Sequence, residues 1–186
     1  QYEVAHVPGT WNIPLSMLAG WAGWLVDYER PVYLIGQREQ LAEAVRILHK
    51  IGVDEVAGYF DAEAVAASGL ASEHYRSATP VEIEGQIASG DVRLIDVRSN
   101  AELNEGFIPN AEHYFLGRLP ENLNRVPQNL PVVAQCLGGA RSAIAASILQ
   151  AAGFDVINLT GGYGAWKRDG LATEKHARQH AVSSQH

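Results

Sequence analysis

The fold of this chain is decided by residues 132–142, which read VVAQCLGGARS. The first three, Val132 to Ala134, form a short apolar run that is typical of a buried strand. Residues 141–152 place apolar side chains at helical spacing, so a helix is expected directly afterwards. Two adjacent glycines between these segments allow the backbone to turn tightly. The sequence therefore predicts a strand, a glycine turn and a helix, with Cys136 at the turn.

The alternation of strand and helix continues on both sides of this stretch. Apolar runs at residues 32–35, 92–96 and 156–159 predict three further strands, and residues 39–51 carry a helical pattern. Thr79-Pro80 is typical of a helix start, and we expect that helix to end near Ser89. Short buried strands that alternate with helices predict an α/β fold, a parallel sheet covered by helices on both faces.

Two parts of the chain share one layout. Residues 30–56 and 131–156 each predict strand, helix, glycine turn and strand. A proline signature precedes each, His6-Val7-Pro8-Gly9 in one case and Phe107-Ile108-Pro109-Asn110 in the other. Self-similarity at an offset of about 100 residues predicts two tandem domains of one kind. The first copy begins almost at its own proline signature, without a strand equivalent to residues 92–96, so we expect it to be incomplete.

Composition excludes several classes of protein. The chain has 186 residues, of which 47% are hydrophobic and 19% charged, so wholesale disorder is excluded. A net charge of −7 argues against nucleic acid or an anionic membrane as the main partner. There is no apolar run of the roughly 18–20 residues that span a bilayer, and no signal peptide. A single cysteine forbids an internal disulfide and suggests a reducing compartment, so we expect a cytoplasmic protein.

Cys136 is the candidate nucleophile. The glycine turn directs backbone N–H groups inward, and the helix start adds unsatisfied donors with partial positive charge. A thiol in such a cradle is expected to be a reactive thiolate, and the same N–H groups could hold an anion. Arg141 supplies a fixed positive charge at the rim. The alternative is an inert buried cysteine, the common fate of a free thiol, but the glycine pair, arginine and helix start favour function.

Four motifs follow one another over residues 78–171. They are the strand Leu94-Ile95-Asp96-Val97-Arg98 with Glu102, the turn Gly106-Phe107-Ile108-Pro109-Asn110-Ala111, the loop at Cys136, and the segment Leu159-Thr160-Gly161-Gly162-Tyr163-Gly164-Ala165-Trp166. Together these motifs resemble those of the rhodanese (sulfurtransferase) family. Phe107 and Asn110 stand where that family usually has His and Gly, at positions that shape a turn.

The resemblance implies a sulfurtransferase that forms a persulfide on Cys136. The donor would be thiosulfate or a low-molecular-weight persulfide, the acceptor a thiol or cyanide, and neither a metal nor a separate cofactor is expected. Cys136 and Arg141 would be catalytic. Arg98 and Glu102 are possible supporting residues, which we expect to form a structural ion pair with each other. The substrate cradle would be formed by Leu137, Gly138, Gly139, Ala140 and Ser142.

The first copy resembles the same family but has Gly36 where the second has Cys136, so it cannot form a persulfide. Residues 12–25 resemble the inactive repeat of fusions that carry a metallo-β-lactamase-like persulfide dioxygenase, and we expect such a domain upstream of this chain. Trp21 and Trp24 are expected in the core or at a domain contact. The expected division is an incomplete, inactive domain at 1–70, a linker at 71–77, an active domain at 78–172 and a polar, frayed tail at 173–186.

Two other functions stay open. A cysteine phosphatase or arsenate reductase uses a related cysteine–loop–arginine cradle, but such phosphatases carry one more residue than the four between Cys136 and Arg141. A non-catalytic scaffold of a larger sulfur-metabolising protein is the second. His176 and His180 are four residues apart, but their place in the polar tail favours solvation over metal binding.

Overall fold

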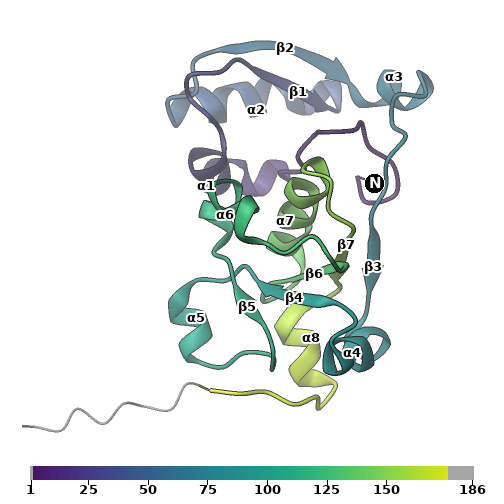
Figure 1. Cartoon of the computed structure of the whole chain (residues 1–186). Helices are drawn as coiled ribbons and strands as arrows, with labels where there is room; N and C mark the ends of the chain where they lie inside the picture. Colours follow the sequence, from purple (N-terminus) through teal and green to yellow (C-terminus); the bar gives the residue numbers. More distant parts are fainter. Residues whose placement is uncertain (1, 176–186) are drawn as a thin grey trace, which may run out of the picture.

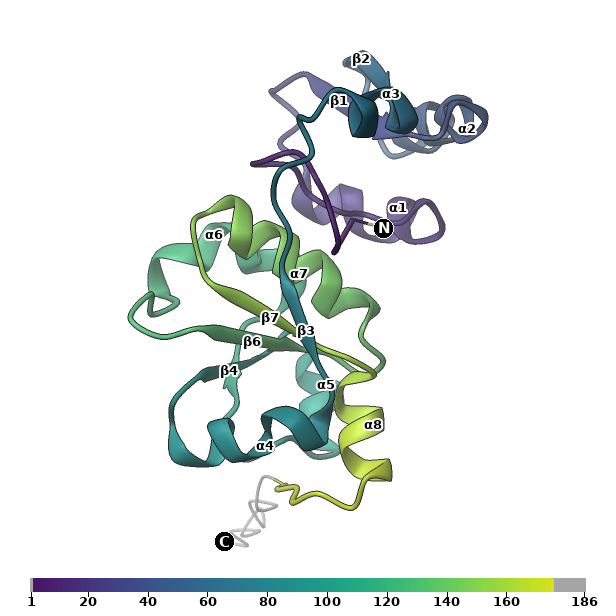
Figure 2. The ribbon, with the colours of Figure 1, turned by 90° about the vertical axis from the view of Figure 1, so that its right-hand side faces the viewer.

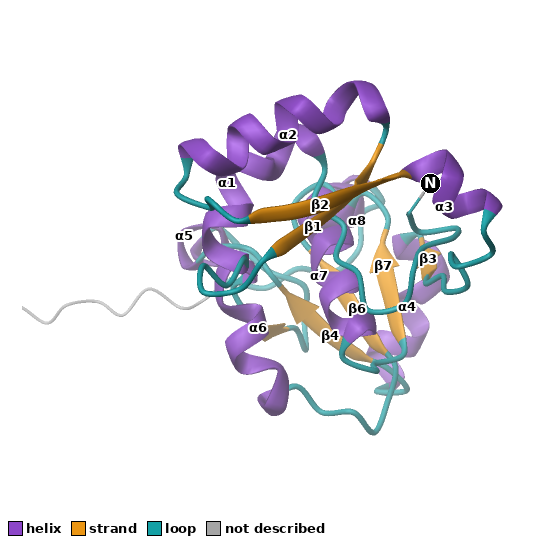
Figure 3. Ribbon diagram, turned by 90° about the horizontal axis from the view of Figure 1, so that it is seen from above, coloured by secondary structure: helices purple, strands orange, loops and turns teal. Residues whose placement is uncertain are grey.

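The N-terminal part contains a small parallel sheet with helices packed against it (Figure 1). The computed structural model describes residues 2–175 of the chain. Strands β1 and β2 lie side by side, and α1 and α2 bury a shared cluster that includes Leu18, Leu48 and Val53 (Figure 3). The elements of this part are α1 (Leu15–Leu25), β1 (Val32–Gly36), α2 (Arg38–Lys50), β2 (Val56–Asp61) and α3 (Ala62–Ala67).

The C-terminal part contains a five-stranded sheet in the order β3-β7-β6-β4-β5, in which every pairing is parallel. This confirms the predicted α/β fold with parallel sheets. The elements are β3 (Arg76–Ala78), α4 (Pro80–Ser89), β4 (Arg93–Asp96), α5 (Asn100–Asn104), β5 (Glu112–His113), η1 (Leu116–Arg118), α6 (Leu119–Asn122), η2 (Leu123–Arg125), β6 (Val132–Gln135), α7 (Ala140–Ala151), β7 (Val156–Leu159) and α8 (Gly162–Arg168).

Alternate residues of the central strand β6 point to opposite faces of the larger sheet. Val132 and Ala134 join a core cluster with α7, whereas Val133 joins a second cluster with α4 and α8. Figure 2 shows α7 on one side of the sheet and α4 on the other. Because both faces are covered, all four residues of β6 are buried. Cys136 follows this strand at the carboxyl end of the sheet, where ligands of open parallel sheets bind.

Two helices of the larger part begin with the same capping arrangement. Thr79 and Glu82 form a capping box at the start of α4, which confirms the helix predicted at Thr79-Pro80. Ser99 and Glu102 form the second box, at the start of α5. Each glutamate sits at the third helical position and accepts hydrogen bonds from the cap residue. The second box matters for the site because it fixes the carboxylate of Glu102.

The larger sheet extends beyond the limits expected from the sequence. Strand β3 begins at Arg76, inside the expected linker at 71–77, and pairs with β7. Three residues without apolar alternation gave no strand signal. Glu174 exchanges two backbone hydrogen bonds with Phe107, so the frayed tail expected from residue 173 is wrong at this position. Residues 176–186, with His176 and His180, lie outside the described residues.

The two parts of the chain contact each other through α1 and the segment before it. The backbone N–H of Asn12 donates to Ser147 Oγ on α7 at 2.8 Å. Trp24 meets Phe115 edge-on at 5.6 Å between ring centroids, and Trp21 lies 6.1 Å from the same ring. Met17 and Trp21 pack against the core cluster on the α7 face. The two tryptophans were expected in the core or at a domain contact, and the structure places both at the contact between the parts.

Several local features recur about 100 residues apart. His6 pairs with Glu73 through an isolated antiparallel bridge, as Phe107 does with Glu174. The glycine turns after α2 and α7 have φ values of 86° and 88° at Gly52 and Gly153. Gly9 has a φ of 76°, and Asn110, the only non-glycine residue with positive φ among residues 2–175, has 65°. Asparagine tolerates this conformation better than most residues, so it replaces the family's glycine at modest cost.

The smaller sheet differs from the larger in its coverage. Tyr33, Ile35 and Phe60 are 60%, 43% and 53% exposed, so apolar side chains of β1 and β2 face solvent. The larger sheet, by contrast, buries the residues of β6 and β7 completely. In the described part of the chain, no helix combines the length and apolar character needed to cross a membrane.

Candidate active site

Cys136 lies between β6 and α7 with its side chain turned into the loop. The residue is 1% exposed and belongs to the core cluster on the α7 face. The backbone N–H of Gly139 donates to its Sγ at 3.1 Å. Ser142 Oγ lies 3.6 Å from the sulfur and donates to the carbonyl of Gly139 at 3.0 Å. The sulfur therefore sits against a backbone donor at the first turn of a helix, a place that stabilises negative charge.

The loop owes its shape to Gly139, which is the N-cap of α7 and has a φ of 97°. A side chain here would be strained and would also meet the backbone nitrogen of Gly161 at 3.1 Å. Leu137, Gly138 and Ala140 form the exposed outer side of the loop. The predicted cradle residues thus divide into two groups: Gly139 and Ser142 contact the sulfur, and the other three face solvent.

The start of α8 supports the loop from below. The backbone N–H of Tyr163 donates to the carbonyl of Cys136 at 2.7 Å, and that of Gly164 donates to Leu137 at 2.8 Å. Gly162 has a φ of 53°, and a Cβ placed on it would lie 2.1 Å from the Cys136 carbonyl oxygen. From the sequence this segment was identified only as a motif, and its support of the loop was not predicted. The available signal was three glycines around Tyr163 directly after a strand.

Arg141 forms a two-pronged ion pair with Glu102. Its Nη1 and Nη2 donate to Glu102 Oε2 and Oε1 at 2.8 and 2.6 Å. The hydrogen bonds from Arg141, helped by those from Ser99, lower the pKa of Glu102 to about 2 against an opposing effect of burial. Glu102 in turn raises the pKa of Arg141, and the nearby Cys136 sulfur adds to this effect. The guanidinium is therefore bound to the carboxylate, and the candidate nucleophile lies near enough to add to the rise in the pKa of Arg141.

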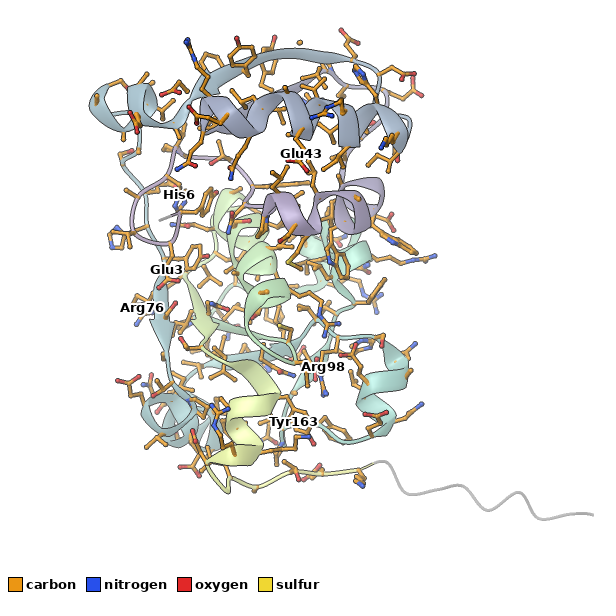
Figure 4. The ribbon with its side chains drawn as sticks, turned by 180° about the vertical axis from the view of Figure 1, so that it is seen from behind. Glu3, His6, Glu43, Arg76, Arg98 and Tyr163 are labelled. Atoms are coloured by element: carbon orange, nitrogen blue, oxygen red, sulfur yellow. The ribbon has the colours of Figure 1, made fainter. Side chains whose placement is uncertain are left out.

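Arg98 has a different partner from the one expected. The predicted ion pair between Arg98 and Glu102 is wrong, because the guanidinium of Arg98 bonds Asp96 at 2.6 Å and the carbonyl of Gly106 at 2.9 Å. Arg98 is 1% exposed and lies over the ring of Tyr163 at 4.3 Å (Figure 4). Asp96, two residues earlier at the end of β4, is within reach of its side chain, whereas Glu102 is held on α5. Arg98 therefore braces the turn at Gly106 rather than the loop.

The equivalent position in the N-terminal part is built differently. Gly36 ends β1, and α2 begins two residues later, at Arg38. By contrast, α7 begins at Ala140, after the longer turn from Cys136. The connection between β1 and α2 therefore offers no thiol, and it has less backbone to surround a ligand. Among residues 2–175, no group of three His, Cys, Asp or Glu side chains is placed to hold a metal ion.

Comparison with known proteins identifies the larger part of the chain. The family model of the rhodanese-like domain matches residues 79–169. A sulfurtransferase of Allochromatium vinosum is 40% identical over 82 residues, which cover 44% of this chain and 77% of that protein. The thiosulfate sulfurtransferase GlpE of Coxiella burnetii is 30% identical over 94 residues, covering 50% of this chain and 88% of that protein.

The solved structures agree with the sequence matches. The crystal structure of a rhodanese-like domain protein from Staphylococcus aureus superimposes with a TM-score of 0.50 at 34% identity. The match covers 55% of this chain and 99% of that one. On these matches, the chain belongs to the rhodanese-like family, and named sulfurtransferases are among its relatives.

Proposed function

We propose that the chain is a sulfurtransferase that carries sulfur as a persulfide on Cys136. The observation that carries this proposal is the position of the Cys136 sulfur, 3.1 Å from the Gly139 N–H at the start of α7 and beside Arg141. Backbone donors and a guanidinium favour the thiolate and would also favour the terminal sulfur of a persulfide. The named sulfurtransferases among the relatives support the same activity.

The reaction is two successive displacements on sulfur. In the first, the thiolate of Cys136 attacks the outer sulfur of thiosulfate or of a persulfide. A new S–S bond forms on Cys136 while the donor's S–S bond breaks, releasing sulfite or a thiolate. In the second, a thiol or cyanide attacks the terminal sulfur, and Cys136 leaves as the thiolate. Arg141 and the Gly139 N–H stabilise the charge on sulfur in both steps.

A phosphatase is less well supported by the loop. Four residues separate Cys136 from Arg141, one fewer than in phosphatases with a related cradle, as the family resemblance implies. A phosphoryl group in transfer needs several donors around its equatorial oxygens, so it needs a wider ring than a single sulfur atom. Hydrolysis of p-nitrophenyl phosphate faster than sulfur transfer would contradict the proposal.

Intact-mass measurement of loaded protein tests the proposal directly. Wild-type protein incubated with thiosulfate or glutathione persulfide, then desalted, should gain the mass of one sulfur atom and lose it on addition of cyanide. Cys136→Ser should gain nothing and keep its fold, because the hydroxyl is nearly isosteric but is not ionised at neutral pH. A scaffold without catalytic function would not gain sulfur from either donor. Sulfur transfer that persists in Cys136→Ser would remove this residue from the mechanism.

We further propose that the N-terminal part is an inactive, incomplete copy of the C-terminal part. The paired bridges of His6 and Phe107, and the matching glycine turns after α2 and α7, support a duplication. The exposed apolar side chains on β1 and β2 support incompleteness, since the larger sheet leaves no such face. Gly36 in place of the cysteine supports its lack of activity. A structure-based superposition of residues 6–70 on 107–171 tests this, and failure to align β1 with β6 would refute it.

A further inference from the structure

The charge balance around Cys136 is unusual for a site that binds a dianion. Between Cys136 and Arg141 the loop carries no charged side chain. Its one cation, Arg141, gives an N–H from each terminal nitrogen to Glu102, at 2.8 and 2.6 Å. With Cys136 as the thiolate, these three groups hold two negative charges against one positive. A positively charged site would be expected for thiosulfate, which itself carries two negative charges.

Glu102 cannot easily move aside to release the guanidinium. Its Oε2 also accepts hydrogen bonds from the backbone N–H of Ser99 at 3.1 Å and from Ser99 Oγ at 2.9 Å. The capping box of α5 therefore holds the carboxylate from one side while Arg141 holds it from the other. Its side chain is only 26% exposed, so solvent screens the pair incompletely. A dianion would have to compete with a carboxylate that is fixed in the favourable geometry.

A persulfide donor avoids this competition. We propose that Glu102 is a specificity-determining residue that directs the site toward persulfides of small thiols and against thiosulfate. This inference rests on the proposed sulfur transfer at Cys136. The reacting end of a protonated persulfide, RS–SH, is uncharged, so it approaches the thiolate without adding charge beside Glu102.

The chemistry of the favoured step balances without an added oxidant or reductant. The Cys136 thiolate attacks the outer sulfur of RS–SH, the donor's S–S bond breaks, and a new S–S bond forms on Cys136. The thiol leaves as RS⁻ and takes a proton from solvent. Arg141, kept near the sulfur by Glu102, offers its remaining N–H groups to the persulfide that results. The new Cys136 persulfide releases its proton to solvent as RS⁻ takes one up, so sulfane sulfur has only changed carrier and Cys136 carries one negative charge before and after.

The test compares kcat/KM for the two donors in wild type and Glu102→Gln. Glutamine keeps the size of the side chain and an oxygen for Ser99 but removes the negative charge. We expect wild type to prefer glutathione persulfide, and Glu102→Gln to raise kcat/KM for thiosulfate about tenfold, since a dianion gains most from losing a nearby charge. The value for glutathione persulfide should change less than about threefold.

Glu82→Gln is the matched control. Glu82 holds the same capping-box position on α4 and accepts hydrogen bonds from Thr79, but within residues 2–175 it has no guanidinium partner equivalent to Arg141. It should therefore leave both values unchanged. If Glu102→Gln fails to fold, wild type alone provides a second test: raising ionic strength should increase the thiosulfate rate more than the persulfide rate, because salt screens repulsion and thiosulfate carries its two charges at the reacting group.

The outcomes separate this inference from the proposed function. If neither donor loads Cys136, the proposed sulfur transfer fails and the inference falls with it. If both donors load Cys136 but thiosulfate is preferred, or its rate falls with salt, the transfer stands and the role of Glu102 is wrong. The same conclusion follows if Glu102→Gln is folded and leaves the ratio of the two kcat/KM values unchanged.

Discussion

Substituting Gly162 by alanine should displace the loop that carries Cys136. A Cβ on Gly162 would lie 2.1 Å from the Cys136 carbonyl oxygen and 2.9 Å from its carbon, far inside ordinary contact distance. The obstacle is backbone, so no side-chain rotation can relieve it. Either the loop must rise by about 1 Å or the start of α8 must retreat, because packed interiors leave little free space. Both movements break the 2.7 Å hydrogen bond from the Tyr163 N–H to that carbonyl.

The cost of this change can be divided into two parts. Gly162 has a φ of 53°, and placing alanine in the left-handed region costs about 1–2 kcal/mol. Losing a buried backbone hydrogen bond and relieving the overlap costs about 2–3 kcal/mol more. We therefore expect Gly162→Ala to lower the free energy of unfolding by about 3–5 kcal/mol, a value typical of backbone overlap in a core. Sulfur loading of Cys136 should fall by at least about a hundredfold, as misplacement by 1 Å can cost that much.

Gly153→Ala is the control that measures the cost of the left-handed backbone conformation alone. Gly153 has a φ of 88° in the turn after α7, and nothing lies within 4 Å of its added Cβ. It should lose only about 1–2 kcal/mol and keep full activity. Urea unfolding followed by tryptophan fluorescence measures the stabilities, and intact mass after persulfide treatment measures loading. Equal losses of stability and unimpaired loading in the two variants would refute the argument that α8 supports the loop.

Three further predictions follow from particular contacts. The low pKa of Glu102, about 2 against an ordinary 4.5, stabilises the fold above about pH 4.5, and this stability is lost as pH falls toward 2. Between pH 6 and pH 3, wild type should therefore lose about 1–2 kcal/mol more than Glu102→Gln in urea unfolding, and equal losses would contradict the ion pair. Asn110→Ala should cost about 1 kcal/mol because its φ is 65°, whereas Asn110→Gly should cost nothing measurable by the same assay. A fragment of residues 73–175 retains β3 and the Phe107–Glu174 bridge, so it should fold and accept sulfur, with a lower Tm because α1 no longer covers the core near α7; failure to fold would show that the two parts share one core.

The secondary structure of the C-terminal part was largely predictable because its signals are local. The apolar run ending at Ala134 and the helical spacing after Arg141 lie in β6 and α7, and Thr79-Pro80 begins α4. Strand β3 was not predicted because its extended structure comes from pairing with β7 and not from a pattern in its own three residues. Such pairing depends on residues distant in sequence, and local periodicity carries no information about them.

The partners of the charged residues could not be predicted for a related reason. Arg98 and Glu102 are close in sequence and opposite in charge, which suggested that they pair with each other. The structure instead assigns Arg98 to Asp96 and Glu102 to Arg141, a residue distant in sequence. The capping box decides this outcome, because it holds the carboxylate of Glu102 toward α7. Sequence spacing identified the residues that matter but not the contacts between them.

The difference between the two proposed copies extends beyond the missing cysteine. In the C-terminal part, Gly161 caps α8 without a side chain, so the next N–H groups are free to hold the loop at Cys136. In the N-terminal part, the equivalent cap is Asp61, whose carboxylate accepts from the N–H groups of Glu63 and Ala64 at 3.0 and 3.1 Å.

The cap of α3 therefore satisfies within its own helix the donors that α8 gives to the active loop. Ala62 also carries a Cβ at the position where Gly162 has no room for one. A thiol placed at Gly36 would still follow a connection that is too short to surround it. It would also have no N–H donors from α3 to hold that connection in place. On the proposed duplication, the first copy lacks the nucleophile, the cradle and the supporting backbone donors together, while its α1 packs against the C-terminal copy.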